Sequence, residues 1–243
     1  AMDGFVTTNE PRGERALGYL DESDLPFYYS LYSTFAMSDH HHASVLGPTW
    51  VNRFYFMSGT SFGLTSNDPI PSERIPAGEP HIVLQQLDER RVPWRVYQSD
   101  IPFIFGGYSH YAGRRLSAIR GIDRFFEDVA AGELPPVTFV DPSFFQGVQQ
   151  SDEHPPANPQ FGERFVHEVT SAVMASPLWE RTAVIVSYDE HGGFFDHVPP
   201  PELTLLRFCR SMFVTRREGE YIFETGSGCV AQAGVKWHDQ RQP

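Results

Sequence analysis

Acidic and imidazole side chains gather in the stretch SYDEHGGFFDHV, residues 187–198. Asp189 and Glu190 are adjacent hard oxygen donors of the kind that divalent cations prefer, and Gly192 and Gly193 free the backbone for a tight turn beside them. This density of groups favours a metal site at Asp189 and Glu190. The alternative is that the carboxylates cap the next element while the histidines are solvated.

The hydroxyl of Thr49 and the guanidinium of Arg53 lie four residues apart in SVLGPTWVNRFYFMSGTS, residues 44–61. Gly47 and Pro48 predict a turn and Trp50–Met57 a helix, which makes Thr49 the expected N-cap. A threonine there either accepts a hydrogen bond from the first turn or acts as a nucleophile favoured by the positive end of the helix. Asn52 and Arg53, one turn further on, could then hold phosphate oxygens.

Two histidines are candidates for proton transfer. His154 lies in SDEHPP, where two prolines stiffen a loop that could hold an imidazole over a site. His110 lies in FGGYSHYAG, among glycines and aromatic residues. The alternative for both is a surface histidine without a catalytic role.

The elements that must position these groups alternate along the chain between strand and helix patterns. Thr182–Tyr188 is short, apolar and β-branched, which is typical of a buried strand of a parallel sheet and would place Asp189 and Glu190 at its carboxyl end. Two further strands are predicted at 94–98 and 136–142, the second ending near Asp141. Helices are predicted at 81–91, at 117–134 with an end near Gly132, and at 162–179. This order predicts a parallel α/β sheet with its ligands at the carboxyl ends of the strands.

Composition sets further limits on the molecule. The 243 residues, 40% of them hydrophobic, can form one sizeable core. The 31 acidic against 19 basic residues give a formal charge of -12, which argues against nucleic-acid binding. No apolar run approaches the ~20 residues of a transmembrane helix, and the first residues lack the pattern of a signal peptide. The two cysteines, Cys209 and Cys229, do not indicate a redox compartment.

Several long motifs resemble a bacterial phosphoesterase family that includes non-haemolytic phospholipase C and a related acid phosphatase. They are GYLDESDLPFYYSLYSTFAMSD, SVLGPTWVNRFYFMSGTSFG, PPVTFVDPSFF, SDEHPP and SPLWERTAVIVSYDEHGGFFDHVPPP. The resemblance runs from about Met2 to Pro201 and implies an alkaline-phosphatase-like, doubly wound α/β fold with a mainly parallel sheet.

The resemblance also implies a mechanism and a set of roles. Thr49 matches a nucleophile that forms a covalent phospho-enzyme, Asp189 and Glu190 match metal ligands that act together with Thr49, and His154 matches a histidine near the leaving group. Asn52, Arg53, His110 and His191 are then expected to contact the substrate. The expected cofactor is a divalent metal ion, and the expected substrate a phosphate ester such as a phospholipid.

This sequence also departs from the family pattern. The family carries an N-terminal segment with two more metal ligands and further strands and a histidine motif beyond Pro201, so we expect 1–204 to be a partial domain that lacks the family's N-terminal and C-terminal parts. Val51 stands where the family has proline. Residues 205–243 resemble the translation of an Alu-type interspersed repeat, and we expect an unrelated, disordered tail. Exposed sheet edges would favour self-association.

Three interpretations of function stay open. The first is a phospholipase C type of phosphoesterase, in which Tyr108, Tyr111 and Trp94 could cage a choline cation. The second is a phosphomonoesterase of the acid phosphatase type, which uses the same nucleophile and metal. The third is a non-catalytic fragment. Members of the family are often exported, but the sequence does not predict where this protein acts.

Overall fold

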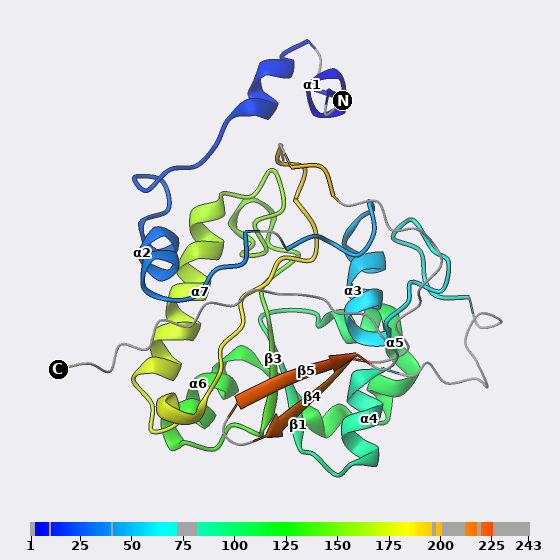
Figure 1. Ribbon diagram of the computed structural model, residues 1–243, viewed down its shortest axis with the longest axis vertical. Helices are drawn as coiled ribbons and strands as arrows, with labels where there is room; N and C mark the ends of the chain where they lie inside the picture. The colour runs from blue at the N-terminus through cyan, green and yellow to red at the C-terminus, as the bar shows by residue number, and fades with distance from the viewer. Residues whose placement is uncertain are drawn as a thin grey trace.

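A three-stranded parallel sheet lies at the centre of the computed structural model (Figure 1). The structure describes residues 3–9, 11–39, 41–71, 82–195 and 198–200, with His110 described by its backbone only, and the backbone of 212–217 and 220–225. Strand β1 (Trp94–Gln98) lies between β2 (Ile119–Gly121) and β3 (Val137–Asp141). In the register of the sheet, Gln98 is opposite Asp141.

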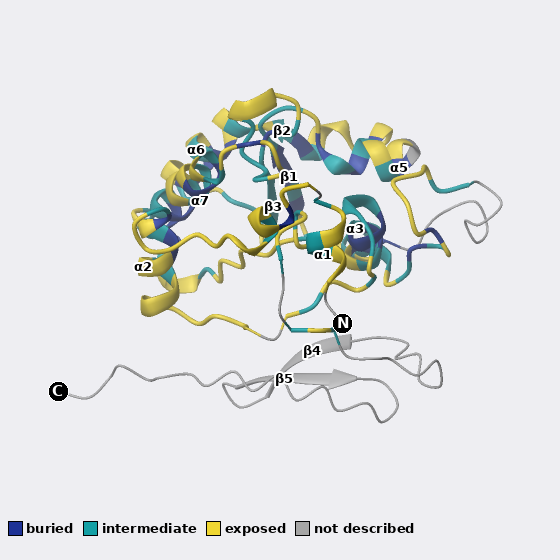
Figure 2. Cartoon of the chain, turned by 90° about the horizontal axis from the view of Figure 1, so that it is seen from above, coloured by how far each residue is buried: buried dark blue, intermediate teal, exposed yellow. Residues whose placement is uncertain are grey.

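Helices cover both faces of this sheet (Figure 2). On one face, Trp94 and Val96 pack in a core with α3 (Thr49–Ser58), α4 (Val83–Glu89) and α5 (Phe103–Gly113). On the other face, Tyr97 packs with Phe125, Val129 and Val173, which belong to α6 (Ile122–Ala131) and α7 (Pro159–Met174). The alternation of Trp94, Val96 and Tyr97 between two cores follows from the two-residue period of a strand. The expected α/β class with a parallel sheet is confirmed.

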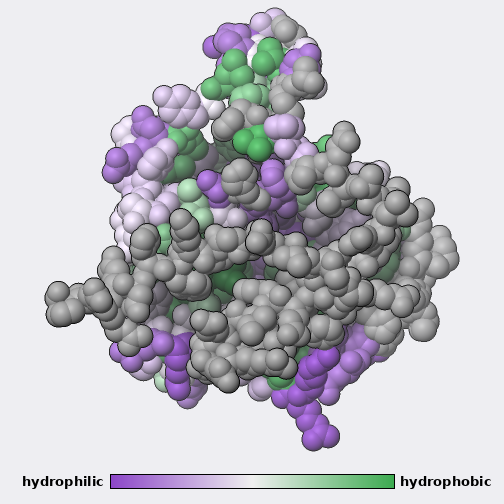
Figure 3. All heavy atoms as spheres, viewed as in Figure 1, coloured by the Kyte–Doolittle hydropathy of each residue, from purple (hydrophilic) through white to green (hydrophobic). Residues whose placement is uncertain are grey.

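The remaining described elements lie outside this sandwich. Helix α2 (Pro26–Thr34) packs on α7, and α1 (Gly4–Thr7) lies near the N-terminus. Helix α1 stands away from the sheet at the top of Figure 1, and hydrophilic and hydrophobic residues are intermixed at this end of the molecule in Figure 3. None of the described helices combines the length and the apolar character that spanning a membrane requires.

Several predicted boundaries agree with the structure within two residues, and three differ, one of them being the end of α7 at Met174 instead of the predicted 179. Helix α6 ends at Ala131, directly before Gly132 and close to the predicted end, because this glycine adopts φ +72°, a left-handed conformation that costs other residues steric strain. The predicted start of that helix at 117 is wrong, since Ile119–Gly121 pairs with β1 instead. Helix α7 begins at Pro159, three residues before the predicted start, because Asn158 caps it by accepting a hydrogen bond from the Gln160 N–H.

The prediction of a buried strand at Thr182–Tyr188 is wrong. The segment has no regular secondary structure, and its apolar side chains are exposed, with Ile185 86% accessible. A strand forms only when a neighbour accepts and donates its backbone hydrogen bonds. Among the described residues, none pairs with this segment.

Within the segment 205–243, the backbone of β4 (Met212–Arg217) and β5 (Glu220–Thr225) forms an antiparallel pair. The other residues of this segment lie outside the described residues. Its disorder and its separate origin therefore stay predictions.

Candidate functional site

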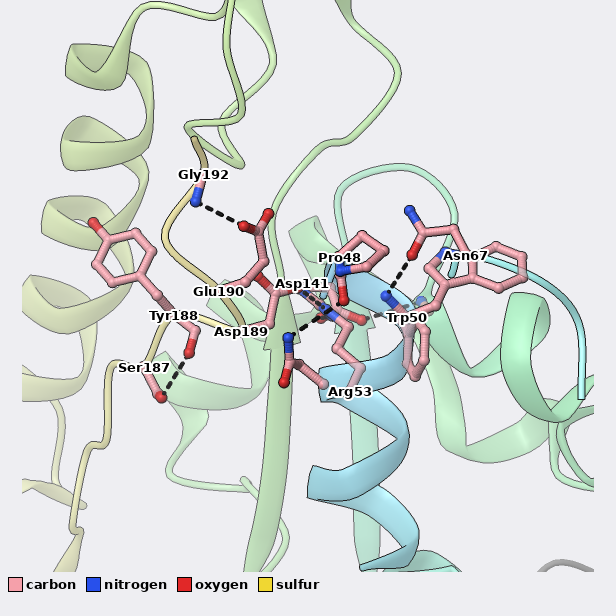
Figure 4. A network of polar contacts seen from close by, with 12 residues as sticks. Pro48, Trp50, Arg53, Asn67, Asp141, Ser187, Tyr188, Asp189, Glu190 and Gly192 are labelled. Atoms are coloured by element: carbon pink, nitrogen blue, oxygen red, sulfur yellow. Dashed lines mark hydrogen bonds and ion pairs between the residues drawn. The ribbon is translucent and has the colours of Figure 1, made fainter. Parts of the chain in front are cut away.

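Arg53 connects three parts of the chain at the carboxyl end of β3 (Figure 4). Its Nε donates to Asp189 Oδ2 over 2.7 Å, and its Nη1 donates to Asp141 Oδ1 over 3.0 Å. Arg53 lies one helical turn after Thr49, the first residue of α3, so both residues share one face of the helix. The site therefore combines the start of α3, the end of β3 and the segment that carries Asp189 and Glu190.

The guanidinium of Arg53 is enclosed by aromatic rings as well as by carboxylates. Its Cζ lies 5.3 Å from the ring centre of Phe103 and 5.1 Å from that of Phe144. Burial alone would lower the pKa of Arg53, but the charges of Asp141 and Asp189 outweigh it and hold this pKa above its usual value. Arg53 is consequently a permanent cation in a fixed position.

Asp141, Phe103 and Phe144 were not among the predicted site residues. The signal for Asp141 was present, because an acidic residue at the carboxyl end of a parallel strand faces the crevice where ligands bind. The backbone N–H of Phe103 also donates to Asp141 Oδ2, over 3.4 Å. No local pattern distinguishes Phe103 and Phe144 from other apolar residues, since their role depends on contact with Arg53.

The loop before α3 is held by Asn52 rather than by a capping threonine. The Asn52 amide oxygen accepts from the Val45 N–H over 2.9 Å, and its nitrogen donates to the carbonyls of Gly47 and Pro48 over 2.9 and 3.4 Å. Asn52 is buried, so these bonds fix the loop. The predicted contact of Asn52 with substrate stays a prediction, and its amide already makes three hydrogen bonds.

Thr49 is not the N-cap, contrary to the prediction. Pro48 is the N-cap and Thr49 the first helical residue, because the chain already has helical geometry at Thr49. The N–H of Trp50 is satisfied by the side-chain oxygen of Asn67, over 2.9 Å. The Thr49 hydroxyl makes no hydrogen bond to any other residue that the structure describes, which leaves it available for chemistry.

The glycines after Glu190 form the predicted turn. Gly192 and Gly193 have φ of +64° and +83°, which favour glycine. The N–H of Gly192 donates to Glu190 Oε2 and that of Gly193 to His191 Nδ1, both over 2.8 Å. The ring of Phe5, in α1, lies edge-on to the ring of His191 at 5.3 Å. The structure thus fixes Glu190 and His191 beside Asp189.

His154 lies on an exposed loop. Its Nδ1 lies 2.8 Å from the carbonyl oxygen of Pro155, a contact in which Nδ1 donates, and its backbone N–H donates to Asp152. No contact among the described residues joins it to Thr49 or Arg53. The side chains of His110 and of Asp196 and His197 lie outside the described residues.

The predicted choline cage of Tyr108, Tyr111 and Trp94 is wrong. These side chains belong to the core, with 3%, 7% and 5% of their surface exposed, because they pack between α5 and β1. The Tyr111 hydroxyl and the Trp94 indole nitrogen donate to Asp88.

The metal-ligating groups of the described residues form only part of a shell. No three side chains of histidine, cysteine, aspartate or glutamate converge on one point anywhere in the described ranges. Asp189 and Glu190 supply two adjacent carboxylates of the right chemical class, and Asp189 also accepts from Arg53. A divalent cation at this position would take its remaining ligands from water, substrate or other donors.

Comparison with known proteins identifies related sequences. A family model described as the phosphoesterase family matches residues 1–207. Non-hemolytic phospholipase C of Pseudomonas aeruginosa is 33% identical over 93% of this chain and 33% of its own length. Non-specific phospholipase C1 of Arabidopsis thaliana is 34% identical over 82% of this chain and 38% of its own length. Phospholipase C A of Mycobacterium tuberculosis is 33% identical over 76% of this chain and 39% of its own length. The chain spans between 33% and 39% of the length of these curated relatives.

Proposed function

This chain belongs to the phosphoesterase family, and on that premise we propose that the site around Thr49, Arg53 and Asp189 hydrolyses phosphate esters of the phospholipase C type. The observation that carries the proposal is the cation of Arg53, held by Asp141 and Asp189 one turn after Thr49. In a protein of net charge -12, a phosphate ester needs local positive charge to bind. Asp141 and Asp189 offset the charge of Arg53, so Arg53 supplies directed N–H donors and the proposed divalent cation supplies the neutralising charge.

In this proposal Thr49 is the nucleophile. As the first residue of α3 it lies at the positive end of the helix dipole, which favours an alkoxide. The Thr49 oxygen attacks phosphorus after losing its proton to water, the bond from phosphorus to the leaving oxygen breaks, and a second water later releases phosphate from Thr49. Arg53 uses two of its five N–H donors for Asp189 and Asp141, and the others are available to phosphoryl oxygens.

His154 would protonate the leaving alcohol. Because Nδ1 donates to the Pro155 carbonyl, Nε2 is the nitrogen that takes up a proton from water and passes it to the leaving oxygen. His110 and His191 are proposed as further substrate contacts, as the sequence predicts.

Asp189 and Glu190 are proposed to hold a divalent cation together with the Thr49 hydroxyl. When bound there, such a cation supplies charge neutralisation for the phosphoryl oxygens. The carboxylates are adjacent in the chain, and the turn at Gly192 fixes Glu190 in place. Their oxygen donors suit magnesium, calcium or manganese in kind.

The test measures release of para-nitrophenol from its phosphate monoester and its phosphorylcholine ester, with and without divalent metals. Metal-dependent turnover is expected, and Thr49→Ala should lower it at least about a hundredfold. The matched control is Thr34→Ala, an exposed threonine of α2 whose hydroxyl donates to the Ser30 carbonyl. It should leave turnover unchanged.

The two substrates separate the classes of activity. Preference for the phosphorylcholine ester supports the phospholipase C type, whereas preference for the monoester would mean a phosphomonoesterase. Turnover equal to that of Thr49→Ala with every metal would overturn the proposal and identify the chain as a non-catalytic fragment.

A further inference from the structure

A single carboxylate joins two tyrosines from distant parts of the chain. Glu153 Oε1 accepts from the Tyr28 hydroxyl over 2.5 Å, and Glu153 Oε2 accepts from the Tyr188 hydroxyl over 2.6 Å. Glu153 directly precedes His154, and Tyr188 directly precedes Asp189. The hydrogen bond between Tyr188 and Glu153 is therefore a short link between the backbones that carry these two proposed site residues.

The anchored end of this link is Tyr28 in α2. Tyr28 is 3% exposed, whereas Tyr188 is 50% exposed. The first turn of α2 is fixed in turn by Glu163 of α7, whose Oε1 accepts from the N–H groups of Phe27 and Tyr28 over 2.7 and 3.1 Å. This satisfies N–H groups that a helix start otherwise leaves without partners. Tyr28 thus holds Glu153 against the packed pair of helices α2 and α7.

The carboxylate occupies space that only a glycine leaves open. A Cβ added to Gly162 of α7 would lie 2.2 Å from Glu153 Cγ and 2.3 Å from its Oε1. Glu153 itself has φ +63°, a left-handed conformation that is uncommon for residues other than glycine. The surrounding structure therefore over-determines the position of this side chain.

The electrostatics agree with this arrangement. Burial is the main cause that raises the pKa of each of Tyr28 and Tyr188, and the charge of Glu153 adds to it. Both hydroxyls consequently keep their protons and act as donors to the carboxylate.

We propose that Glu153 is a positioning residue, which sets the segment of Asp189 and Glu190 relative to the loop of His154 through its hydrogen bonds to Tyr188 and Tyr28. The apolar side chains of Val184, Ile185 and Val186, which precede Tyr188, are all exposed. Packing of these residues does little to fix Asp189, so the contacts of Tyr188 and Arg53 have the larger effect. The inference rests on the proposed function for the roles of Asp189 and His154.

The test uses the full chain and two readouts. Tyr188→Phe and Tyr28→Phe each remove one hydroxyl of the link, and Tyr29→Phe, whose hydroxyl donates to the Leu20 carbonyl, is the matched control. The first readout is turnover of the para-nitrophenyl esters. Loss of one charge-assisted hydrogen bond should lower kcat about tenfold with KM changed less than about twofold, since positioning affects the reacting geometry more than binding.

The second readout is hydrogen exchange, which does not depend on activity. The amides of Gly192 and Gly193 are protected by Glu190 and His191. We expect these amides to exchange about tenfold faster in Tyr188→Phe and also in Tyr28→Phe, although Tyr28 lies in a different element. Tyr29→Phe should exchange like the wild type.

Gly162→Ala displaces the carboxylate without removing any polar group, and Gly113→Ala is its control because a Cβ there meets no atom within 4 Å. Of these two glycine variants, Gly162→Ala should reproduce the lower kcat and the faster exchange of Tyr188→Phe, and Gly113→Ala should not. Faster exchange in α2 and α7 alone, with the Gly192 amide and kcat as in the wild type, would overturn the inference. The expected exchange pattern in a chain without turnover would overturn the proposed function and support the positioning role.

Discussion

Replacement of Arg53 by methionine tests the arrangement on which the site depends. Methionine has a similar length and no charge, so the aromatic contacts with Phe103 and Phe144 are largely kept while the hydrogen bonds to Asp141 and Asp189 are lost. Two carboxylates would then face one another without the cation between them. We expect the free energy of unfolding to fall.

The size of the effect follows from burial. The side chains of Arg53, Asp141 and Asp189 are 20%, 17% and 23% exposed, so water screens their charges only in part. Removing one partner of a buried pair costs about 3–5 kcal/mol, and partial exposure favours the lower end, about 3 kcal/mol. Arg53→Lys keeps the charge but cannot bond both carboxylates in the same way, and should cost about 1–1.5 kcal/mol.

Urea denaturation measures these losses, with unchanged m-values as the check that the denatured state is the same. A double-mutant cycle with Asp189→Asn should give a coupling energy of about 1.5 kcal/mol between Arg53 and Asp189. The matched control is Arg164→Met, which removes an exposed pair with Glu168 at 4.0 Å and should cost about 0.5 kcal/mol or less. An Arg53→Met variant no less stable than Arg164→Met would refute the reasoning.

Three further predictions concern stability. Burial, with smaller effects of Glu163 and Asp152, raises the pKa of Glu153. The free energy of unfolding of the wild type should therefore exceed that of Glu153→Gln most in acid, and the difference should shrink as the pH rises through the folded-state pKa. Urea denaturation from about pH 4 to 8 measures this difference, and a constant value would contradict the prediction. Asn52→Ala removes the amide that holds the loop before α3 and should cost about 2–3 kcal/mol in thermal unfolding, while an unchanged melting temperature would show that the loop is held by other contacts. Ile185→Ala should change the free energy of unfolding by less than about 0.5 kcal/mol, because this side chain is exposed. Val96→Ala, in the core, should lower it by about 2–3 kcal/mol. Equal losses in the two variants would mean that the segment of Ile185 is buried.

The sequence by itself determined the elements whose signals are local. The strand at Trp94–Gln98, the strand that ends at Asp141 and the end of α6 near Gly132 were all predicted from short apolar runs and their flanking residues. The turn at Gly192 and Gly193 was predicted for the same reason. These features depend on backbone preferences that act over a few neighbouring residues.

Only the tertiary structure decided which strands pair and which residues meet. Thr182–Tyr188 has the composition of a strand and lies unpaired, because strand formation depends on a hydrogen-bonding neighbour as well as on residue type. Arg53 meets Asp141 across 88 residues and Asp189 across 136, and Glu153 meets Tyr28 across 125. Residue spacing carries no information on contacts over such separations, since they result from the packing of α3, β3, α2 and α7 around the sheet.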